Sequence, residues 1–165
     1  MRLPRIITIL LVAVSLATSV GKAAAQEIER SWQERLTTHI SETYKISNAK
    51  TIVDAVLMMS HAYEIEPSLL FAIIHVESRF QSRAKNSSGA TGLTQVMLPL
   101  HKSKFDKNSS VYDPEENIRV GAEIWKECEL KSKTFNQAAR CYSGDSTSWA
   151  RKVSSQQIKF KQELL

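Results

Sequence analysis

The chain has 165 residues, with 22 Lys and Arg, 17 Asp and Glu and a formal net charge of +5. A hydrophobic content of 42% and a charged content of 24% exclude a disordered or fibrous protein. The first 25 residues hold three of the basic residues and no acidic one, so the remaining 140 residues have a net charge of only +2. Basicity is therefore largely a property of the N-terminal segment, and we expect no nucleic-acid partner.

Residues 1–25 have the three parts of a secretory signal peptide. Basic residues at positions 2 and 5 precede an apolar run at 6–17, and three alanines at 23–25 match the pattern that signal peptidase reads. A membrane-spanning helix is the alternative, but the run is shorter than the roughly 20 residues that a bilayer requires. The segment contains no Cys, so we expect a periplasmic protein that is not a lipoprotein, with an uncleaved anchor as the open alternative.

The mature chain predicts a single mainly α domain of five to seven helices around one core. No stretch alternates long enough to build a large sheet. Residues 26–46 are polar with sparse apolar residues at helical spacing, which fits either a docking helix or a frayed terminus. Residues 47–165 form the main domain.

Capping signals mark where the predicted helices begin. Ser47 or Asn48 suits an N-cap, and Pro67 suits a first helical position. Asp113, followed by a proline, can cap a helix in which Glu116 completes a capping box. We expect helices at about residues 48–63, 67–80, 113–131, 134–142 and 147–161. The intervening segments are a turn-rich loop at 86–92, a short apolar piece at 93–98 closed by Pro99, and a loop at 101–112.

Cys128 and Cys141 are the two cysteines of the chain. An even count in an exported protein favours a disulfide, and each cysteine falls on the expected packed face of its helix. Two buried free thiols are the alternative. The four histidines are scattered and no Cys or His pair has metal-ligand spacing, so we expect no metal and no cofactor.

Glu77 is the residue that we expect to carry the chemistry. Leu70, Ile73 and Ile74 lie on its side of the predicted helix, so its carboxylate projects from an apolar stripe. Burial penalises the charged form, and the negative end of the helix dipole disfavours a further negative charge. Both effects raise the pKa, as a general acid for glycosidic cleavage requires. The alternative is a partly exposed Glu paired with one of the basic residues at 79–85.

Three motifs give this residue a context. The chain carries Glu-Ser at 77–78, Gly-Leu-x-Gln-x-Met at 92–97 and Asp-Pro-x-x-Asn-Ile at 113–118. In this order and spacing they resemble the catalytic domain of the soluble lytic transglycosylases, which share the goose-type lysozyme fold. The resemblance covers about residues 65–153. The small size and the leader resemble specialised members that open the cell wall for conjugation, secretion systems or phage.

The resemblance implies that Glu77 is the sole catalytic acid and base. It would protonate the oxygen that links N-acetylmuramic acid to N-acetylglucosamine in peptidoglycan, and then take the proton of the muramic acid C6 hydroxyl as a 1,6-anhydro ring closes. Residues 78–105 contain no Asp or Glu, so no second carboxylate is visible nearby in the sequence.

The remaining site residues carry over from the same motifs. Ser78 and Gln95 would orient the sugar, although Ser78 could instead bond its own helix and Gln95 could simply be solvated. Met97 would line the groove, with core packing as a close rival. Tyr142 would reach the catalytic carboxylate or the sugar. Gly89 and Gly92 would supply positive φ or close backbone approach.

Two departures from the family pattern stand out. Leu98 intervenes before the proline that often follows the Met directly, and Ser143 replaces the Asn of the family's Ala-Tyr-Asn-x-Gly stretch. The substitution supports one rival hypothesis, a non-catalytic glycan-binding scaffold that docks a secretion or conjugation apparatus. A hydrolytic muramidase is the other rival. In each case we expect a monomer.

Overall fold

The computed structural model describes residues 22, 27, 30–144 and 146–163. The predicted signal peptide therefore lies outside the described residues, apart from Lys22. The chain divides into two compact units, Met1–Arg35 and Leu36–Leu165. In the first unit residues 30–35 are helical, and Arg35 donates to the Ser31 hydroxyl at 2.7 Å.

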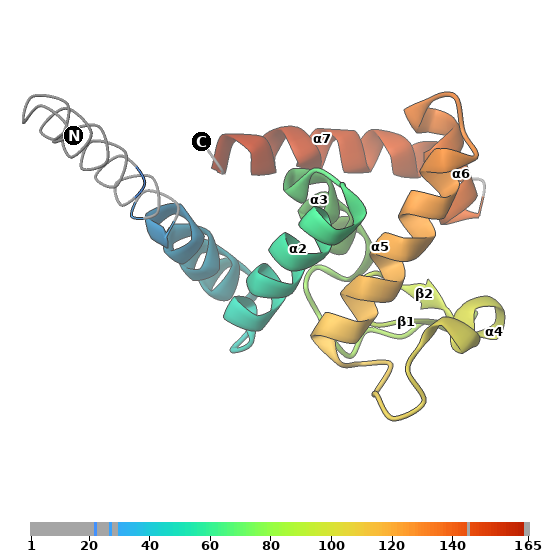
Figure 1. The fold of residues 1–165 in the computed structure, drawn as a ribbon, viewed down its shortest axis with the longest axis horizontal. Coiled ribbons are helices and arrows are strands. Elements are labelled where there is room, and N and C mark those ends of the chain that lie inside the picture. Colours follow the sequence, from blue (N-terminus) through green and yellow to red (C-terminus); the bar gives the residue numbers. More distant parts are fainter. Residues whose placement is uncertain (1–21, 23–26, 28–29, 145, 164–165) are drawn as a thin grey trace, which may run out of the picture. The chain divides into compact units, whose positions relative to one another are not determined.

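The second unit is mainly α, as predicted (Figure 1). Residues 36–44 are helical and bury Leu36 and Ile40, so this part of the polar N-terminal segment docks rather than frays. The elements that follow are α2 (Ala49–Tyr63), α3 (Pro67–Ser78), β1 (Ala90–Thr91), β2 (Val96–Met97), α4 (Leu98–His101), a 3₁₀ turn (Lys102–Lys104), α5 (Pro114–Leu130), α6 (Phe135–Ser143) and α7 (Thr147–Glu163).

Helix α3 forms the centre of the core. Its residues from Ser68 to Ile74 are all buried, and a helix that is apolar on every side must be covered on every side. Helices α2 and α7 pack against it, with α7 crossing above it in Figure 1. The C-terminal end of α3, where Glu77 lies, is therefore held between other helices.

The helix starts follow the predicted caps with two corrections. Pro67 opens α3, and the Asp113 carboxylate accepts from the Glu116 backbone N–H at 3.0 Å. The Glu116 side chain does not complete a capping box, because it accepts from Arg119 and from a loop N–H instead. Asn48 occupies the N-cap of α2 but makes no capping bond, because its amide donates to the Ser82 hydroxyl at 2.9 Å.

Helix α3 ends two residues earlier than predicted. Arg79 and Phe80 both adopt left-handed backbone conformations, with φ of 50° and 63°, and these stop the helix at Ser78. Burial of Phe80 offsets the strain, because its ring is fully covered and packs against the rings of Tyr44 and Phe160 at centroid distances of 4.6 Å and 6.1 Å.

A two-stranded antiparallel hairpin occupies the segment expected to be a loop and a short apolar piece. Ala90 pairs with Met97, and Thr91 pairs with Val96. Gly89 and Gly92 have φ of 93° and 81°, so their predicted positive φ is confirmed. Pro99 does not close this segment, because it lies in the first turn of α4, where its missing N–H costs no hydrogen bond.

The hairpin is fixed to α5 by Asn117, the Asn of the Asp-Pro-x-x-Asn-Ile motif. Its fully buried amide accepts from the Thr94 backbone N–H and donates to the carbonyls of Thr91 and Val111. A Cβ at Gly92 would lie 2.5 Å from Asn117 Cγ, so only glycine permits this approach. Thr94 of the hairpin packs equally closely against Gly121 of α5. A Cβ at Gly121 would lie 2.6 Å from Thr94 Cβ, so a larger residue would clash there.

A disulfide joins Cys128 of α5 to Cys141 of α6, so the predicted bridge is confirmed. The expectation that both cysteines lie on packed helix faces is wrong for Cys141. Cys128 is buried, but Cys141 lies on an exposed part of α6 rather than on a packed face. The bond holds together two helices that are joined by a short connection.

Removing this bridge should destabilise the fold. Closing a loop of about 15 residues stabilises a protein by roughly 3 kcal/mol in the chain-entropy model. We therefore expect a Cys128→Ala/Cys141→Ser variant to lose about 3 kcal/mol of unfolding free energy in urea titrations. Wild type in reducing agent separates the cross-link from packing effects. An unfolding curve that neither the substitutions nor reduction alters would contradict the prediction.

Candidate active site

Glu77 lies in the last turn of α3, in the setting that its sequence predicted. Leu70, Ile73 and Ile74 are at most 1% exposed, so the carboxylate leaves the helix from an apolar face. The Glu77 side chain is partly buried. Its Oε1 accepts a hydrogen bond from Trp149 Nε1 of α7 at 2.7 Å, and this contact takes the place of the ion pair considered as the alternative.

Burial raises the pKa of Glu77 to about 7, and the Trp149 hydrogen bond opposes that rise. Burial prevails because it removes water from the charged form, whereas one indole N–H supplies a single replacement contact. A carboxyl with this pKa exists in both protonation states near neutral pH. It can therefore give a proton to a leaving oxygen and later accept one, which is the requirement for a single acid–base group.

Trp149 is the site residue that sequence reasoning missed. It lies 72 residues after Glu77 in the chain, in the first turn of α7, and no spacing relates the two. Its ring packs against that of Tyr142 at 5.3 Å and against that of Trp125 at 6.1 Å. This aromatic contact fixes the direction of the indole N–H toward the carboxylate.

Tyr142 lies beside Glu77 but bonds elsewhere. Its hydroxyl donates to the Thr94 backbone carbonyl at 2.9 Å. Burial, and next the negative charge of Glu77, raise the pKa of Tyr142, so the hydroxyl stays a proton donor. Tyr142 thus ties α6 to the loop before β2. The resemblance implied that Tyr142 contacts either the catalytic carboxylate or the sugar, and in this structure Trp149 contacts the carboxylate instead.

Gln95 and Met97 come from the hairpin beside this tyrosine. Gln95 has φ of 49°, and its Nε2 donates to the carbonyls of Gly92 and Ala84 at 2.9 Å and 3.2 Å. Its amide group thus braces the loop. Met97 is partly exposed in β2. Their contacts with a sugar stay predictions.

The two serines of the site differ in their hydrogen bonds. The Ser78 hydroxyl donates to the Ile74 carbonyl at 3.1 Å, which is the local helix bond considered as its alternative. The Ser143 hydroxyl, at the family's Asn position, is buried without a hydrogen-bond partner in the part of the chain that the structure describes. The described residues also contain no cluster of three His, Cys, Asp or Glu side chains suited to a metal ion.

The raised pKa of Glu77 makes stability depend on pH. The folded protein keeps a proton that the unfolded chain releases near pH 4.5, so the stabilisation is complete below about pH 4.5 and is lost as the pH rises through about 7. We expect Glu77→Gln to match wild type in unfolding free energy at about pH 4, and to exceed it by up to about 3 kcal/mol above about pH 8. Urea titrations across this range test it.

Glu42→Gln, at an exposed position, is the matched control and should show no such gain. A difference between Glu77→Gln and wild type that stays constant with pH would refute the raised pKa.

Trp149→Phe should raise the pKa of Glu77 further. The substitution keeps an aromatic ring against Tyr142 but removes the hydrogen bond that favours the charged carboxylate. Carboxyl NMR titration of Glu77 measures the shift. Trp125→Phe is the control, because the indole N–H of Trp125 has no partner among the described residues. An unmoved or lowered Glu77 pKa in Trp149→Phe would contradict the role given to this bond.

Comparisons with known proteins agree with this geometry. Residues 54–164 match the family model "Transglycosylase SLT domain". The chain is 32% identical over 98 residues to a transglycosylase of Enterobacteria phage PRD1, covering 58% of this chain and 36% of that protein. It is 35% identical over 82 residues to membrane-bound lytic murein transglycosylase C of Edwardsiella ictaluri, covering 44% of this chain and 23% of that protein.

The fold also has a solved counterpart. An inactive mutant of lytic transglycosylase Slt from Pseudomonas aeruginosa superposes with a TM-score of 0.51 at 22% identity, over 67% of this chain and 21% of that one. This likeness confirms the expected lysozyme-like fold. The chain spans only part of the curated relatives that it matches, namely 36% of the length of the phage protein and 23% of the length of the Edwardsiella protein. The family match covers well over half of the chain, which therefore belongs to the SLT transglycosylase domain family.

Proposed function

We propose that this protein is a peptidoglycan lytic transglycosylase in which Glu77 is the single catalytic acid and base. One observation carries the proposal: a partly buried carboxyl with a pKa of about 7 stands at the Glu-Ser position of an SLT domain. The named relatives support the same activity, since both are described as transglycosylases.

In the proposed reaction the proton moves twice and no water is consumed. Protonated Glu77 gives its proton to the glycosidic oxygen, which links C1 of N-acetylmuramic acid to C4 of N-acetylglucosamine, and the bond from C1 to this oxygen breaks. The resulting carboxylate takes the proton of the muramic acid C6 hydroxyl, and O6 bonds to C1 as the 1,6-anhydro ring closes. Glu77 returns to its protonated form, ready for the next strand.

The surroundings of Glu77 favour this route over a two-carboxylate hydrolysis. A two-carboxylate glycosidase places its second carboxyl within about 5–9.5 Å of the first. The causes of the Glu77 pKa shift are burial and the Trp149 bond, with no carboxylate of the described chain among them. The stretch from 78 to 105 contains no Asp or Glu. We therefore assign non-hydrolytic cleavage rather than muramidase activity.

The substrate contacts belong to the same proposal. Gln95 and Met97 on the hairpin would form one wall of the glycan groove, with Tyr142 of α6 beside them. The bond from Tyr142 to the Thr94 carbonyl supports a shared wall, because it links the two segments next to Glu77. Ser78 would act through the end of α3, whose carbonyl it already bonds.

The cellular setting follows from the leader and the substrate. We place the protein in the periplasm after export by the 1–25 signal peptide, acting alone or beside a secretion, conjugation or phage system. The phage transglycosylase among the relatives supports the last of these. Within the described ranges no helix has the length and hydropathy to cross a bilayer.

Glu77→Gln should abolish cleavage and leave the fold intact. The amide keeps the shape and can still accept the Trp149 bond, but it cannot transfer a proton, and losing general acid–base catalysis costs about 10²–10⁴-fold in rate. Mass spectrometry of fragments released from purified sacculi measures the rate and identifies 1,6-anhydro ends. Near-wild-type digestion by the variant would overturn the assignment.

The same assay separates the rivals. Reducing N-acetylmuramic acid ends from the wild-type protein would identify a hydrolytic muramidase. Sedimentation with sacculi but no release of fragments would identify a non-catalytic scaffold.

A further inference from the structure

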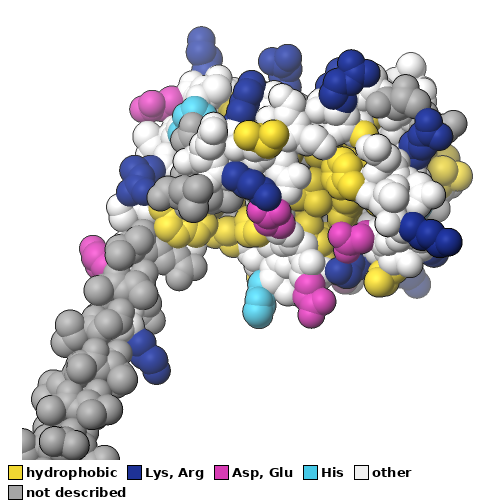
Figure 2. Space-filling model, turned by 90° about the horizontal axis from the view of Figure 1, so that it is seen from above, with side chains coloured by type: hydrophobic (Ala, Val, Ile, Leu, Met, Phe, Trp, Pro, Cys, Tyr) yellow, Lys and Arg dark blue, Asp and Glu magenta, His cyan; other side chains and the backbone are white. Residues whose placement is uncertain are grey.

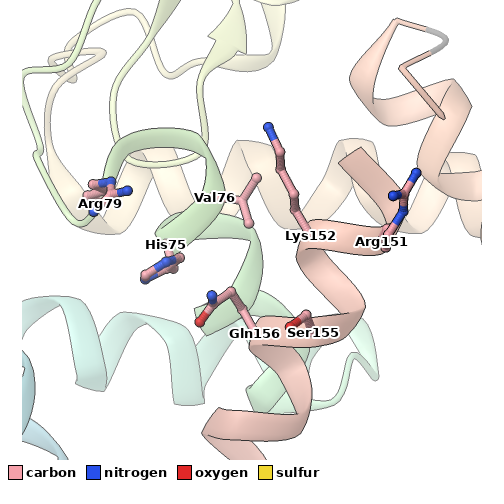
Figure 3. Close-up of a pocket in the computed structure, with 7 residues that line it drawn as sticks. All are labelled: His75, Val76, Arg79, Arg151, Lys152, Ser155 and Gln156. Atoms are coloured by element: carbon pink, nitrogen blue, oxygen red, sulfur yellow. The ribbon is translucent and has the colours of Figure 1, made fainter. Parts of the chain in front are cut away.

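A basic pocket lies between α3 and α7, apart from the bond between Glu77 and Trp149. Its volume is about 450 Å³, and it opens to solvent. Arg79, the C-cap of α3, and Arg151 and Lys152 of α7 supply three cationic side chains to its lining. Figure 3 shows these side chains coming from neighbouring helices, with Val76 of α3 close to Lys152 in the view.

The cations of this basic pocket have no ion-pair partner in the part of the chain that the structure describes. Among those residues no Asp or Glu lines the pocket, and none of the three cations forms an ion pair. By contrast, Lys104 lies 2.6 Å from both Glu123 and Glu127. Unpaired cations around an open hollow make its electrostatic potential positive, so an anion that enters is attracted by their combined field.

Other contacts agree with a positive field in the pocket. The charges of Arg79 and Lys159 both lower the pKa of His75, which lines the pocket, although burial lowers it more. The Tyr44 hydroxyl bonds His75 Nδ1 at 2.6 Å and holds the ring in place. Figure 2, viewed from the side of α7, shows Lys and Arg side chains spread across this face.

The position of the basic pocket indicates what the anion is. Val76 immediately precedes Glu77, and Lys152 follows Trp149 by three residues on α7, about one helical turn. An occupant of the pocket would therefore lie within reach of a glycan held at Glu77. The sugars of such a strand are neutral, whereas the short peptide attached to each muramic acid ends in carboxylates. Arg side chains bind carboxylates well because their planar fork matches the two oxygens.

We propose that the basic pocket binds the carboxylates of the peptide stem on the strand that Glu77 cleaves, so that the protein prefers stem-bearing glycan to glycan stripped of its peptides. This inference rests on the proposed function. It adds a specificity site, built from α7 and the end of α3, to the reaction assigned to Glu77.

The binding test uses a probe that contains no cleavable glycosidic bond. N-acetylmuramyl-L-alanyl-D-glutamate carries two carboxylates, and NMR titration of the full protein reports where it binds. We expect shifts at the backbone amides of 75–79 and 151–156. Arg151→Gln and Lys152→Gln should each weaken binding about two- to fivefold, and the double variant about tenfold, because exposed ion pairs contribute little individually. Lys50→Gln, which removes an exposed cation of α2, should not change it.

The specificity test compares two substrates. The ratio of cleavage rates on intact strands and on amidase-stripped strands should exceed one for wild type and fall toward one for the Arg151→Gln/Lys152→Gln variant. If the wild-type protein binds the probe at these amides but cleaves neither substrate, the pocket assignment is supported and the proposed function is refuted. Equal cleavage of both substrates by wild type would overturn the specificity claim.

Parallel titrations distinguish the peptide carboxylates from other anions that the pocket could bind. Inorganic phosphate and phosphatidylglycerol vesicles are titrated in parallel with the probe. Pocket-dependent binding of either, without pocket-dependent binding of the muramyl peptide, would overturn the proposal. If Lys50→Gln lost as much probe affinity as Lys152→Gln, the proposal would also be overturned, because binding would then depend on the net charge of the protein and not on the pocket.

Discussion

The buried amide of Asn117 is the contact on which the layout of the candidate site depends. It satisfies backbone groups of the hairpin and of the loop before α5, which would otherwise be buried unpaired at a cost of about 1–3 kcal/mol each. The approach requires glycine at 92 and at 121. With the hairpin seated, the Thr94 carbonyl faces the Tyr142 hydroxyl, and that bond brings α6 to the same place. A single amide thus orders three segments around the end of α3.

Glu77 shows why such a rigid frame is needed. Its raised pKa means that the folded protein is less stable at alkaline pH than it would be with a neutral side chain there. The frame offsets that cost with apolar burial along α3 and with the aromatic packing of Trp149 against Tyr142. The carboxyl therefore keeps both its proton affinity and a fixed direction, which a surface glutamate would not.

The sequence predicted features that local chemistry decides. Pro67 and Asp113 marked helix starts, glycine marked positive φ, and the apolar neighbours of Glu77 predicted its raised pKa. It missed features that depend on contacts between distant residues. The Trp149 bond spans 72 positions. Glu116 bonds to Arg119 and to the Asp106 backbone N–H, and Asn48 bonds to Ser82, so neither side chain makes the predicted capping bond. Arg79 and Phe80 left the helix early because burial of one ring outweighed their helical preference.

Helix α7 makes two contributions to the candidate site that the motifs did not reveal. Its first turn supplies the indole that bonds Glu77, and its next turn supplies two of the three cations of the basic pocket. Because α7 is packed along α3, a shift of α7 would change the pKa of the acid and the position of the bound anion together. In the proposed reaction one helix would thus help to position both the acid, through the indole bond, and the peptide stem, through two cations. Stem recognition and proton transfer would then be linked through one rigid element.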